Sequence, residues 1–237
     1  MASSIVGFLI VFITILCSCS LTFGSYQYLH LVLQWAPAQC RVSDFKCTKP
    51  AAHDKFTVHG IWPSNFKDPQ PRDCKLSSSK DQTLDMKNLP QKLVDRLTKL
   101  WPSLTSTDED FWRLQWKTHG TCSFSMFGQA KYFWLAERLW EHMNIFEMLR
   151  EDGIVPTPGK MFDQNDIIEA IKKHHFHGQV AIKPEFHCRP ISQSGSKPPS
   201  PLSSELLEIR LCVDHDGFNY FNCTSGGNCG QKFEWFI

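Results

Sequence analysis

The sequence predicts a single α+β domain with a central antiparallel sheet and several packed helices. Segments with strand character stand near both ends of the chain, and segments with helical periodicity occupy the middle. This order, in which strands and helices do not alternate, is typical of the α+β class. About 210 residues follow an N-terminal leader, which is enough for one domain with a sizeable core.

Strands are expected on both sides of the helical region. Residues 26–35 alternate between apolar and polar side chains before Pro37, and residues 55–62 are rich in β-branched and aromatic side chains before Pro63. The later expected strands, with a Ser/Pro-rich loop between the first two, are 179–187, 205–214 and 231–237.

Helices are expected after a polar loop at 65–84. Leucines recur at helical spacing in 89–100, and Thr107 or Asp108 can cap a helix that continues through Gln115. Two further amphipathic helices are expected at 130–150, which Pro156 and Pro158 follow, and at 163–175.

The N-terminus predicts a secretory signal peptide. Residues 1–24 contain no Lys, Arg, Asp or Glu, and an apolar run at 5–17 precedes small and polar residues. This pattern predicts cleavage near Gly24, with 25–237 as the mature domain. The run is shorter than the roughly 20 apolar residues that a membrane span needs. We therefore expect a secreted, extracellular monomer without a membrane segment, with a retained anchor as the alternative.

Charge and cysteine content restrict the possible partners. The 25 Lys and Arg against 24 Asp and Glu give a net charge of +1, so the chain does not hold a polyanion by bulk charge. Eight cysteines remain outside the leader, and an even number in a secreted chain favours disulfides, although the residues alone do not fix the pairing. No Cys-x-x-Cys pair follows the leader, so no metal site is expected.

Two segments carry a histidine followed by a glycine in an aromatic frame. His59 lies in Phe-Thr-Val-His-Gly-Ile-Trp-Pro at 56–63, and His119 lies in the segment 111–122. A single histidine is ordinarily packed in the core or solvated, but two in matching contexts suggest a shared function. We expect each glycine to let a substrate approach the imidazole closely.

Both segments resemble the two signature motifs of the ribonuclease T2 family, and the whole mature chain resembles that family. The first motif of the family, Phe-Thr-x-His-Gly-Leu-Trp-Pro, is matched except at Ile61. The second resembles Phe-Trp-x-His-Glu-Trp-x-Lys-His-Gly-Thr-Cys. Leu114, Gln115 and Thr118 replace its first His, its Glu and its Lys.

The resemblance implies a ribonuclease T2-like fold and a metal-free, cofactor-free cleavage of single-stranded RNA. His119 would take the proton from a ribose 2′-OH, which attacks phosphorus to form a 2′,3′-cyclic phosphate, and His59 would protonate the departing 5′-oxygen. Gln115 would keep a hydrogen-bonding role in catalysis. The residues expected to contact bases are Gln34, Trp62 and Phe111, while Trp112 and Trp116 are expected in the core.

The cysteine spacing resembles that of the plant branch of the family. The implied disulfides are Cys40–Cys47, Cys74–Cys122, Cys188–Cys229 and Cys212–Cys223. In this branch, stylar S-RNases act in gametophytic self-incompatibility with an F-box type pollen partner, whereas S-like RNases act in phosphate scavenging and defence. The computed pI of about 7.6 leans toward the first role.

The departures from the second motif predict a slower enzyme. Gln115 carries no charge, Thr118 is too short to deliver a cation, and Lys117 lies about 100° away around a helix. A non-catalytic binding protein on the same fold is therefore an alternative. Asn222 fits a glycosylation sequon, and the cluster at 172–177 is interpreted as an exposed helix end rather than a metal or RNA site.

Overall fold

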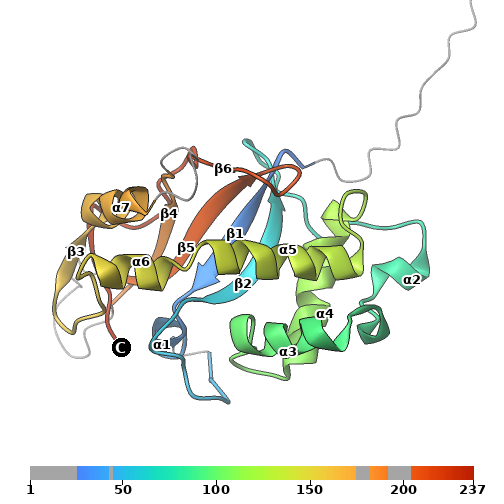
Figure 1. The fold of residues 1–237 in the computed structure, drawn as a ribbon, viewed down its shortest axis with the longest axis horizontal. Helices are drawn as coiled ribbons and strands as arrows, with labels where there is room; N and C mark the ends of the chain where they lie inside the picture. Colours follow the sequence, from blue (N-terminus) through green and yellow to red (C-terminus); the bar gives the residue numbers. More distant parts are fainter. Residues whose placement is uncertain (1–25, 43–44, 175–181, 192–203) are drawn as a thin grey trace, which may run out of the picture.

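The structure is a computed structural model, and it describes residues 26–42, 45–174, 182–191 and 204–237. The expected signal peptide at 1–24, most of the Ser/Pro-rich loop at 191–204 and part of the cluster at 172–177 lie outside these residues. Figure 1 shows a sheet at the centre of the molecule with helices packed across it.

In the described residues the sheet has seven strands. Its main path runs in the order β2-β1-β5-β7-β3, and β4 and β6 also pair with β5. Every strand pairing is antiparallel except that of β5 with β7, which is parallel at Glu205 and Glu234. The sheet is therefore antiparallel at its centre, as expected, and mixed only through this one pair. The strands are β1 (Tyr28–Gln34), β2 (Thr57–Ser64), β3 (Met161–Asp163), β4 (Glu185–Pro190), β5 (Ser204–Asp214), β6 (Tyr220–Phe221) and β7 (Lys232–Glu234).

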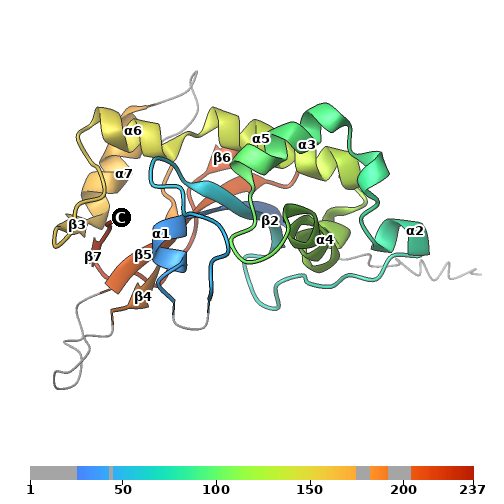
Figure 2. The same ribbon diagram turned by 90° about the horizontal axis from the view of Figure 1, so that it is seen from below.

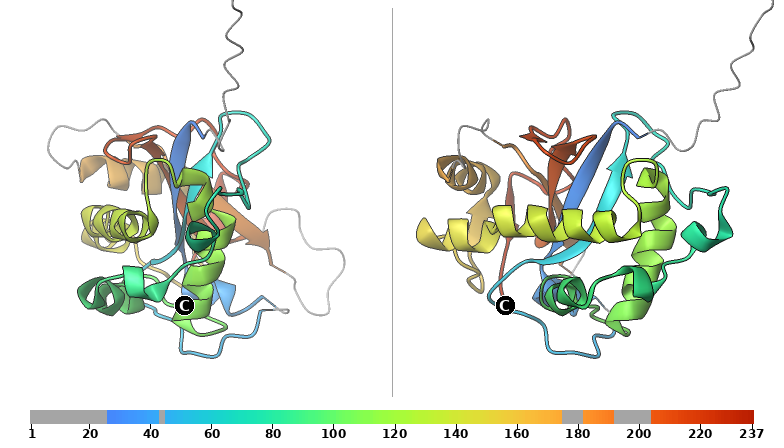
Figure 3. Two further views of the ribbon diagram at one scale, coloured as in Figure 1. Left: turned by 90° about the vertical axis from the view of Figure 1, so that its right-hand side faces the viewer. Right: turned by 45° about the vertical axis from the view of Figure 1, so that its right-hand side comes forward.

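The long helices lie mostly on one side of this sheet. Figure 3 (left) shows α5, α6 and α7 gathered on that side, and Figure 2 shows α3 beside α5. No helix of the described residues is both long and apolar enough to cross a membrane. The helices are α1 (Ala36–Gln39), α2 (Ser79–Gln82), α3 (Gln91–Leu100), α4 (Asp108–Thr118), α5 (Gln129–His142), α6 (Ile145–Glu151) and α7 (Gln164–Lys173), with 3-10 turns at Met86–Asn88 and Gly120–Ser123.

Strand alternation gives the sheet two different faces. On β1, Leu29, Leu31 and Leu33 pack into the main core with the helices. The intervening positions project from the opposite face because successive side chains of a strand alternate. His30 is in register with Cys212 of β5, and Gln34 is in register with Glu208. The face away from the core therefore gathers polar side chains from several strands.

Two strands differ from their expected boundaries because of proline. Pro63 was expected to end β2, but β2 continues to Ser64. β2 is the edge of the main sheet path, where a missing N–H costs no ladder bond. Residues 179–181 of the strand expected at 179–187 lie outside the described residues. β4 begins at Glu185, after Pro184, and runs to Pro190 rather than ending at the expected His187. The last strand is also shorter than expected, because its partner β3 has only three residues.

The helix expected at 130–150 is two helices. α5 ends at His142, and the side chain of Asn144 caps a new helix by accepting from the backbone N–H of Glu147 at 3.3 Å. Asparagine favours this capping position over a helix interior, which explains the break. Of the two expected caps of α4, Thr107 is the one that accepts, from the N–H of Asp110 at 3.1 Å.

The four implied disulfides are all present. Cys40–Cys47 closes a short loop after α1, and Cys74–Cys122 joins residues 48 positions apart. The other two, Cys188–Cys229 and Cys212–Cys223, hold the C-terminal segment to β4 and β5. The second of the four fastens the loop after β2 to the end of α4.

We expect Gly227→Ala to destabilise the fold by about 2–4 kcal/mol in urea unfolding, because Gly227 has φ of +85° and an added Cβ would lie 2.0 Å from the backbone oxygen of Phe186. Gly226→Ala is the matched control. Its Cβ would meet nothing closer than 3.9 Å. Equal effects of the two substitutions would show that the close approach to Phe186 is not what requires glycine.

Candidate active site

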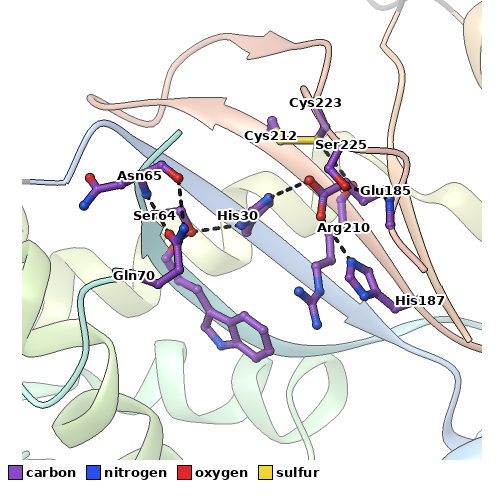
Figure 4. A network of polar contacts seen from close by, with 12 residues as sticks. His30, Ser64, Asn65, Gln70, Glu185, His187, Arg210, Cys212, Cys223 and Ser225 are labelled. Carbon is purple, nitrogen blue, oxygen red and sulfur yellow. Dashed lines mark hydrogen bonds and ion pairs between the residues drawn. A yellow bond between two sulfur atoms is a disulfide. The ribbon is translucent and has the colours of Figure 1, made fainter. Parts of the chain in front are cut away.

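A cavity of about 760 Å³ opens on the polar face of the sheet. Both predicted catalytic histidines, His59 and His119, line it. Its walls come from β1, β2, β4, β5, the loop after β2 and the end of α4. Figure 4 shows part of this face, with side chains from β1, β4 and β5 pointing toward one another.

His59 reaches this face through a bulge in β2. Gly60 pairs with Val32, and Val58 pairs with the next residue, Leu33, so that His59 is the extra residue of the strand. A bulge re-aims one side chain relative to the regular alternation. The backbone is held at this point, since the indole N–H of Trp101 donates to the carbonyl oxygen of His59 at 2.9 Å.

An ion network orients the ring of His59. Its Nδ1 lies 2.6 Å from Oε1 of Glu208, whose other oxygen accepts from Nη2 of Arg210 at 2.8 Å. Burial opposes ionisation of Glu208, but the hydrogen bond and charge of His59, together with Arg210, outweigh it and lower the pKa of Glu208 to about 2. The carboxylate of Glu208 therefore accepts a hydrogen bond from Nδ1 of His59, which leaves Nε2 free to exchange a proton.

His119 has a different environment. It follows the last residue of α4 and is buried, with its ring stacked on Trp62 at a centroid distance of 4.9 Å and an interplanar angle of 18°. Burial lowers the pKa of His119 to about 3, and the positive charges of Arg72, His59 and Arg210 act in the same direction. His119 is therefore neutral near pH 7 and able to accept a proton.

Gln115 lies beside the two histidines. Its Oε1 accepts from the indole N–H of Trp62 at 3.3 Å, and both residues line the cavity. The glycine of the first motif makes this contact possible, because a Cβ at Gly60 would lie 2.2 Å from Trp62 Nε1 and 2.4 Å from Gln115 Oε1. Gly120 likewise makes room for Trp116, at 2.3 Å. The interpretation that these glycines admit substrate was therefore wrong: protein side chains fill the space.

Of the three expected base-contacting residues, one lines the cavity. Trp62 is half-buried and lines the cavity. Phe111 is half-buried, and its ring lies 6.0 Å from that of His59. Gln34 is only 3% exposed. Neither Phe111 nor Gln34 is among the residues that line this cavity. Trp112 and Trp116 are in the core, as expected.

The replaced motif positions and the nearby lysine are also resolved. Leu114 is 55% exposed at the rim of the cavity, and Thr118 is buried in its wall. Lys117 points to solvent and is not among the lining residues. The expectation that Lys117 does not supply a cation at this site agrees with that placement.

The sequence analysis missed a second polar cluster in the same cavity. Nδ1 of His30 lies 2.9 Å from Oγ of Ser64, and Nε2 lies 3.5 Å from the carboxylate of Glu185, which also bonds Nε2 of His187 at 3.1 Å (Figure 4). Burial disfavours the charge of Glu185, but its hydrogen bonds to the two histidines prevail and lower its pKa to about 2. The alternation of apolar and polar residues at 26–35 could have identified this cluster from the sequence, since it places His30 on the polar face.

This cluster is a poor metal site. Ligand atoms of His30, Glu185, Cys212 and Cys223 lie within 4.8 Å of one another, and this is the one such group among the described residues. The two sulfurs form a disulfide and offer no thiolate ligand. Only one imidazole and one carboxylate then remain in the group, fewer than the three protein ligands of a catalytic zinc site.

We expect His119→Gln to flatten the dependence of stability on pH between pH 6.5 and pH 4.5. The unfolded chain protonates this histidine near its ordinary pKa of 6.5, whereas the folded protein does so only near 3, so protons favour unfolding as the pH falls through this window. Urea unfolding at several pH values measures the difference. Below 4.5 both proteins should lose stability, because Glu185 and Glu208 have folded pKa values of about 2. Equal slopes above pH 4.5 would contradict the perturbed environment of His119.

Comparisons with known proteins bear on this site. Curated relatives include Ribonuclease S-6 of Pyrus pyrifolia, 32% identical over 92% of this chain and 89% of the relative, and Ribonuclease 1 of Arabidopsis thaliana, 30% identical over 92% and 90%. Similar solved structures include ribonuclease MC1 from bitter gourd seeds, with a TM-score of 0.72, 27% identity, and coverage of 89% of this chain and 100% of that one.

A self-incompatibility-associated ribonuclease of Nicotiana alata is also similar, with a TM-score of 0.71, 26% identity, and coverage of 90% of this chain and 100% of that one. The model of the Ribonuclease T2 family matches residues 26–223, which span both histidine motifs and seven of the eight paired cysteines. With the α+β fold and the histidine cavity, these matches show that the chain belongs to the ribonuclease T2 family.

Proposed function

We propose that this ribonuclease cleaves single-stranded RNA by transesterification, with His119 as the general base and His59 as the general acid. The carrying observation is that one cavity holds two imidazoles in different environments. His119 is buried and neutral, as a base requires, and Nδ1 of His59 is bonded to the ionised carboxylate of Glu208, which leaves Nε2 free to deliver a proton.

The reaction balances with these two groups. His119 removes the proton of the 2′-OH as the 2′-oxygen attacks phosphorus, and the bond from phosphorus to the 5′-oxygen breaks as His59 gives that oxygen a proton. The product is a 2′,3′-cyclic phosphate, which water hydrolyses with the two roles exchanged. A substrate without the 2′-OH provides no nucleophile, so DNA is not cleaved.

Substrate binding is proposed to rest on local contacts. Two similar proteins of known structure are nucleotide complexes, RNase NT with 5′-AMP and a mutant of RNase MC1 with 5′-GMP. In this chain Trp62 is the best placed of the expected base-contacting residues, although its ring already contacts His119 and Arg210. Gln34 and Phe111 stay predictions as base contacts.

Turnover is proposed to be slower than in a relative with the complete second motif. Gln115 can donate a hydrogen bond to a phosphoryl oxygen, but it cannot carry charge, and Thr118 has no cationic group. The loss of one preorganised charged donor costs roughly 10²–10³ in rate.

The biological setting is proposed from the leader and the relatives. Secretion would follow from the signal peptide at 1–24, and Asn222, which is exposed, would be the glycan acceptor. Relatives include both Ribonuclease S-1 of Pyrus pyrifolia and Extracellular ribonuclease LE of Solanum lycopersicum. We propose the stylar S-RNase role, in a monomer with an F-box type partner. Expression confined to the pistil would support it, and induction by phosphate starvation would support the S-like role instead.

We expect His59→Ala and His119→Ala each to lower the release of 2′,3′-cyclic nucleotides from polyuridylate at least about 10²-fold, because each removes one proton-transfer group. His142→Ala, an exposed histidine at the end of α5, is the control and should match the wild type. Circular dichroism checks the fold of each variant. A wild type with no release, indistinguishable from both variants, would favour the non-catalytic binding protein.

A further inference from the structure

We propose that Arg72 is a catalytic residue of this ribonuclease: its guanidinium binds the phosphoryl oxygens and stabilises the negative charge of the phosphorane. This inference rests on the proposed function, because it assigns a role in the same reaction. Attack of the 2′-oxygen places negative charge on the equatorial oxygens of phosphorus, and a fixed cation at that point lowers the barrier. Neither Gln115 nor Thr118 carries such a charge.

The backbone places Arg72 beside the end of α4. The N–H of Asp73 donates to the carbonyl oxygen of Thr118 at 2.9 Å, and the next residue, Cys74, is joined to Cys122. These two links hold the segment 72–74 against residues 118–122, on either side of His119. The side chain of Arg72 lines the cavity together with Thr118 and His119.

The other cation in the cavity is already neutralised. Among the described lining residues, the Lys and Arg side chains are those of Arg72 and Arg210. Arg210 donates to Glu208 from Nε at 3.1 Å and Nη2 at 2.8 Å, and its guanidinium lies 4.7 Å from the centroid of the Trp62 ring. Arg210 therefore positions Glu208 and Trp62, and its charge is balanced within the protein.

Arg72 has its donors available. In the described part of the chain its guanidinium makes no hydrogen bond and no ion pair within 4.0 Å, and the side chain is exposed. The carboxylates in the cavity wall are those of Asp68 and Glu185. Glu185 is bonded to His187 at 3.1 Å, and Asp68 accepts from Gln70 at 3.2 Å. Arg72 is thus the cation free to form two parallel bonds to a phosphate.

The electrostatics agree with this placement. Of the charges that lower the pKa of His119, that of Arg72 is the largest, after the effect of burial. Arg72 and His119 line the same cavity, so the guanidinium faces the space in which His119 would deprotonate a ribose hydroxyl. The same charge favours the neutral form of His119, so Arg72 supports the base and the transition state together.

The test compares Arg72→Ala with Arg96→Ala, whose side chain binds Glu141 on the opposite, helical side of the protein. Single-turnover cleavage of a dinucleotide should fall about 10²–10³-fold in Arg72→Ala, more than the roughly tenfold rise in KM expected from weaker phosphate binding, and Arg96→Ala should match the wild type. Arg72→Gln, which keeps the length of the side chain without the charge, should behave as Arg72→Ala does. An Arg72→Ala rate within about twofold of an active wild type would overturn the proposal.

A double-mutant cycle locates the role. Thr118→Lys places a cation in the same wall, so it should restore most of the rate lost in Arg72→Ala and raise the rate of the wild type by a smaller factor. An equal rate gain from Thr118→Lys in the wild type and in Arg72→Ala would overturn the proposal, since it would show that Arg72 does not supply the missing charge.

A binding measurement separates this inference from the proposed function. Inorganic phosphate, titrated against the full mature chain and followed by the NMR signals of His119, should bind about tenfold more weakly to Arg72→Ala than to the wild type. Unchanged phosphate affinity would overturn the role of Arg72, even in an active enzyme. A wild type that binds phosphate through Arg72 but cleaves no RNA would instead contradict the proposed function.

Discussion

Strand β1 hydrogen-bonds to β2 on one side and to β5 on the other, and this pairing determines both the core and the site. Leu29, Leu31 and Leu33 meet the helices, while His30 and Gln34 lie on the opposite face, in register with Cys212 and Glu208 of β5. A slip of one residue in register would exchange the two sets. It would bury an imidazole under the helices and turn leucines toward the cavity. The apolar packing of the sheet therefore enforces the position of the polar face.

The bulge at His59 interrupts this alternation in β2. Regular pairing would place His59 on the same face as Ile61, which belongs to the core. The extra residue lets Val58 take the core position and lets His59 meet Glu208. Bonds from Trp101 and Tyr132 to the carbonyl oxygens of β2 hold the backbone at this irregular point.

The second histidine is positioned by a helix end and not by the sheet. The turn after α4 is held by Cys74–Cys122 and by the bond from Asp73 to Thr118. Stacking of His119 on Trp62 then joins this end of α4 to β2. The result is two imidazoles in different surroundings in one cavity, one desolvated and one bonded to a carboxylate.

The sequence by itself determined the element types, the two candidate caps Thr107 and Asp108, and the two histidine motifs, because these depend on neighbours within a few residues along the chain. The disulfide pairing followed from resemblance to relatives. The break at Asn144 was readable in the same local way, as an N-cap, but the long apolar face concealed it. Local conformational preferences depend on neighbouring residues, so the sequence alone can indicate them.

Only the tertiary structure decided what surrounds His59 and His119. Glu208 is 149 positions from His59, and Arg72 is 46 positions before Thr118 in the chain. Their proximity depends on strand register, on the bulge in β2 and on the loop that Cys74–Cys122 closes. Such contacts form only when distant segments pack, so no local sequence pattern predicts them. The sequence therefore predicts the two histidines of the cavity, whereas the charged residues around them are identified only from the fold.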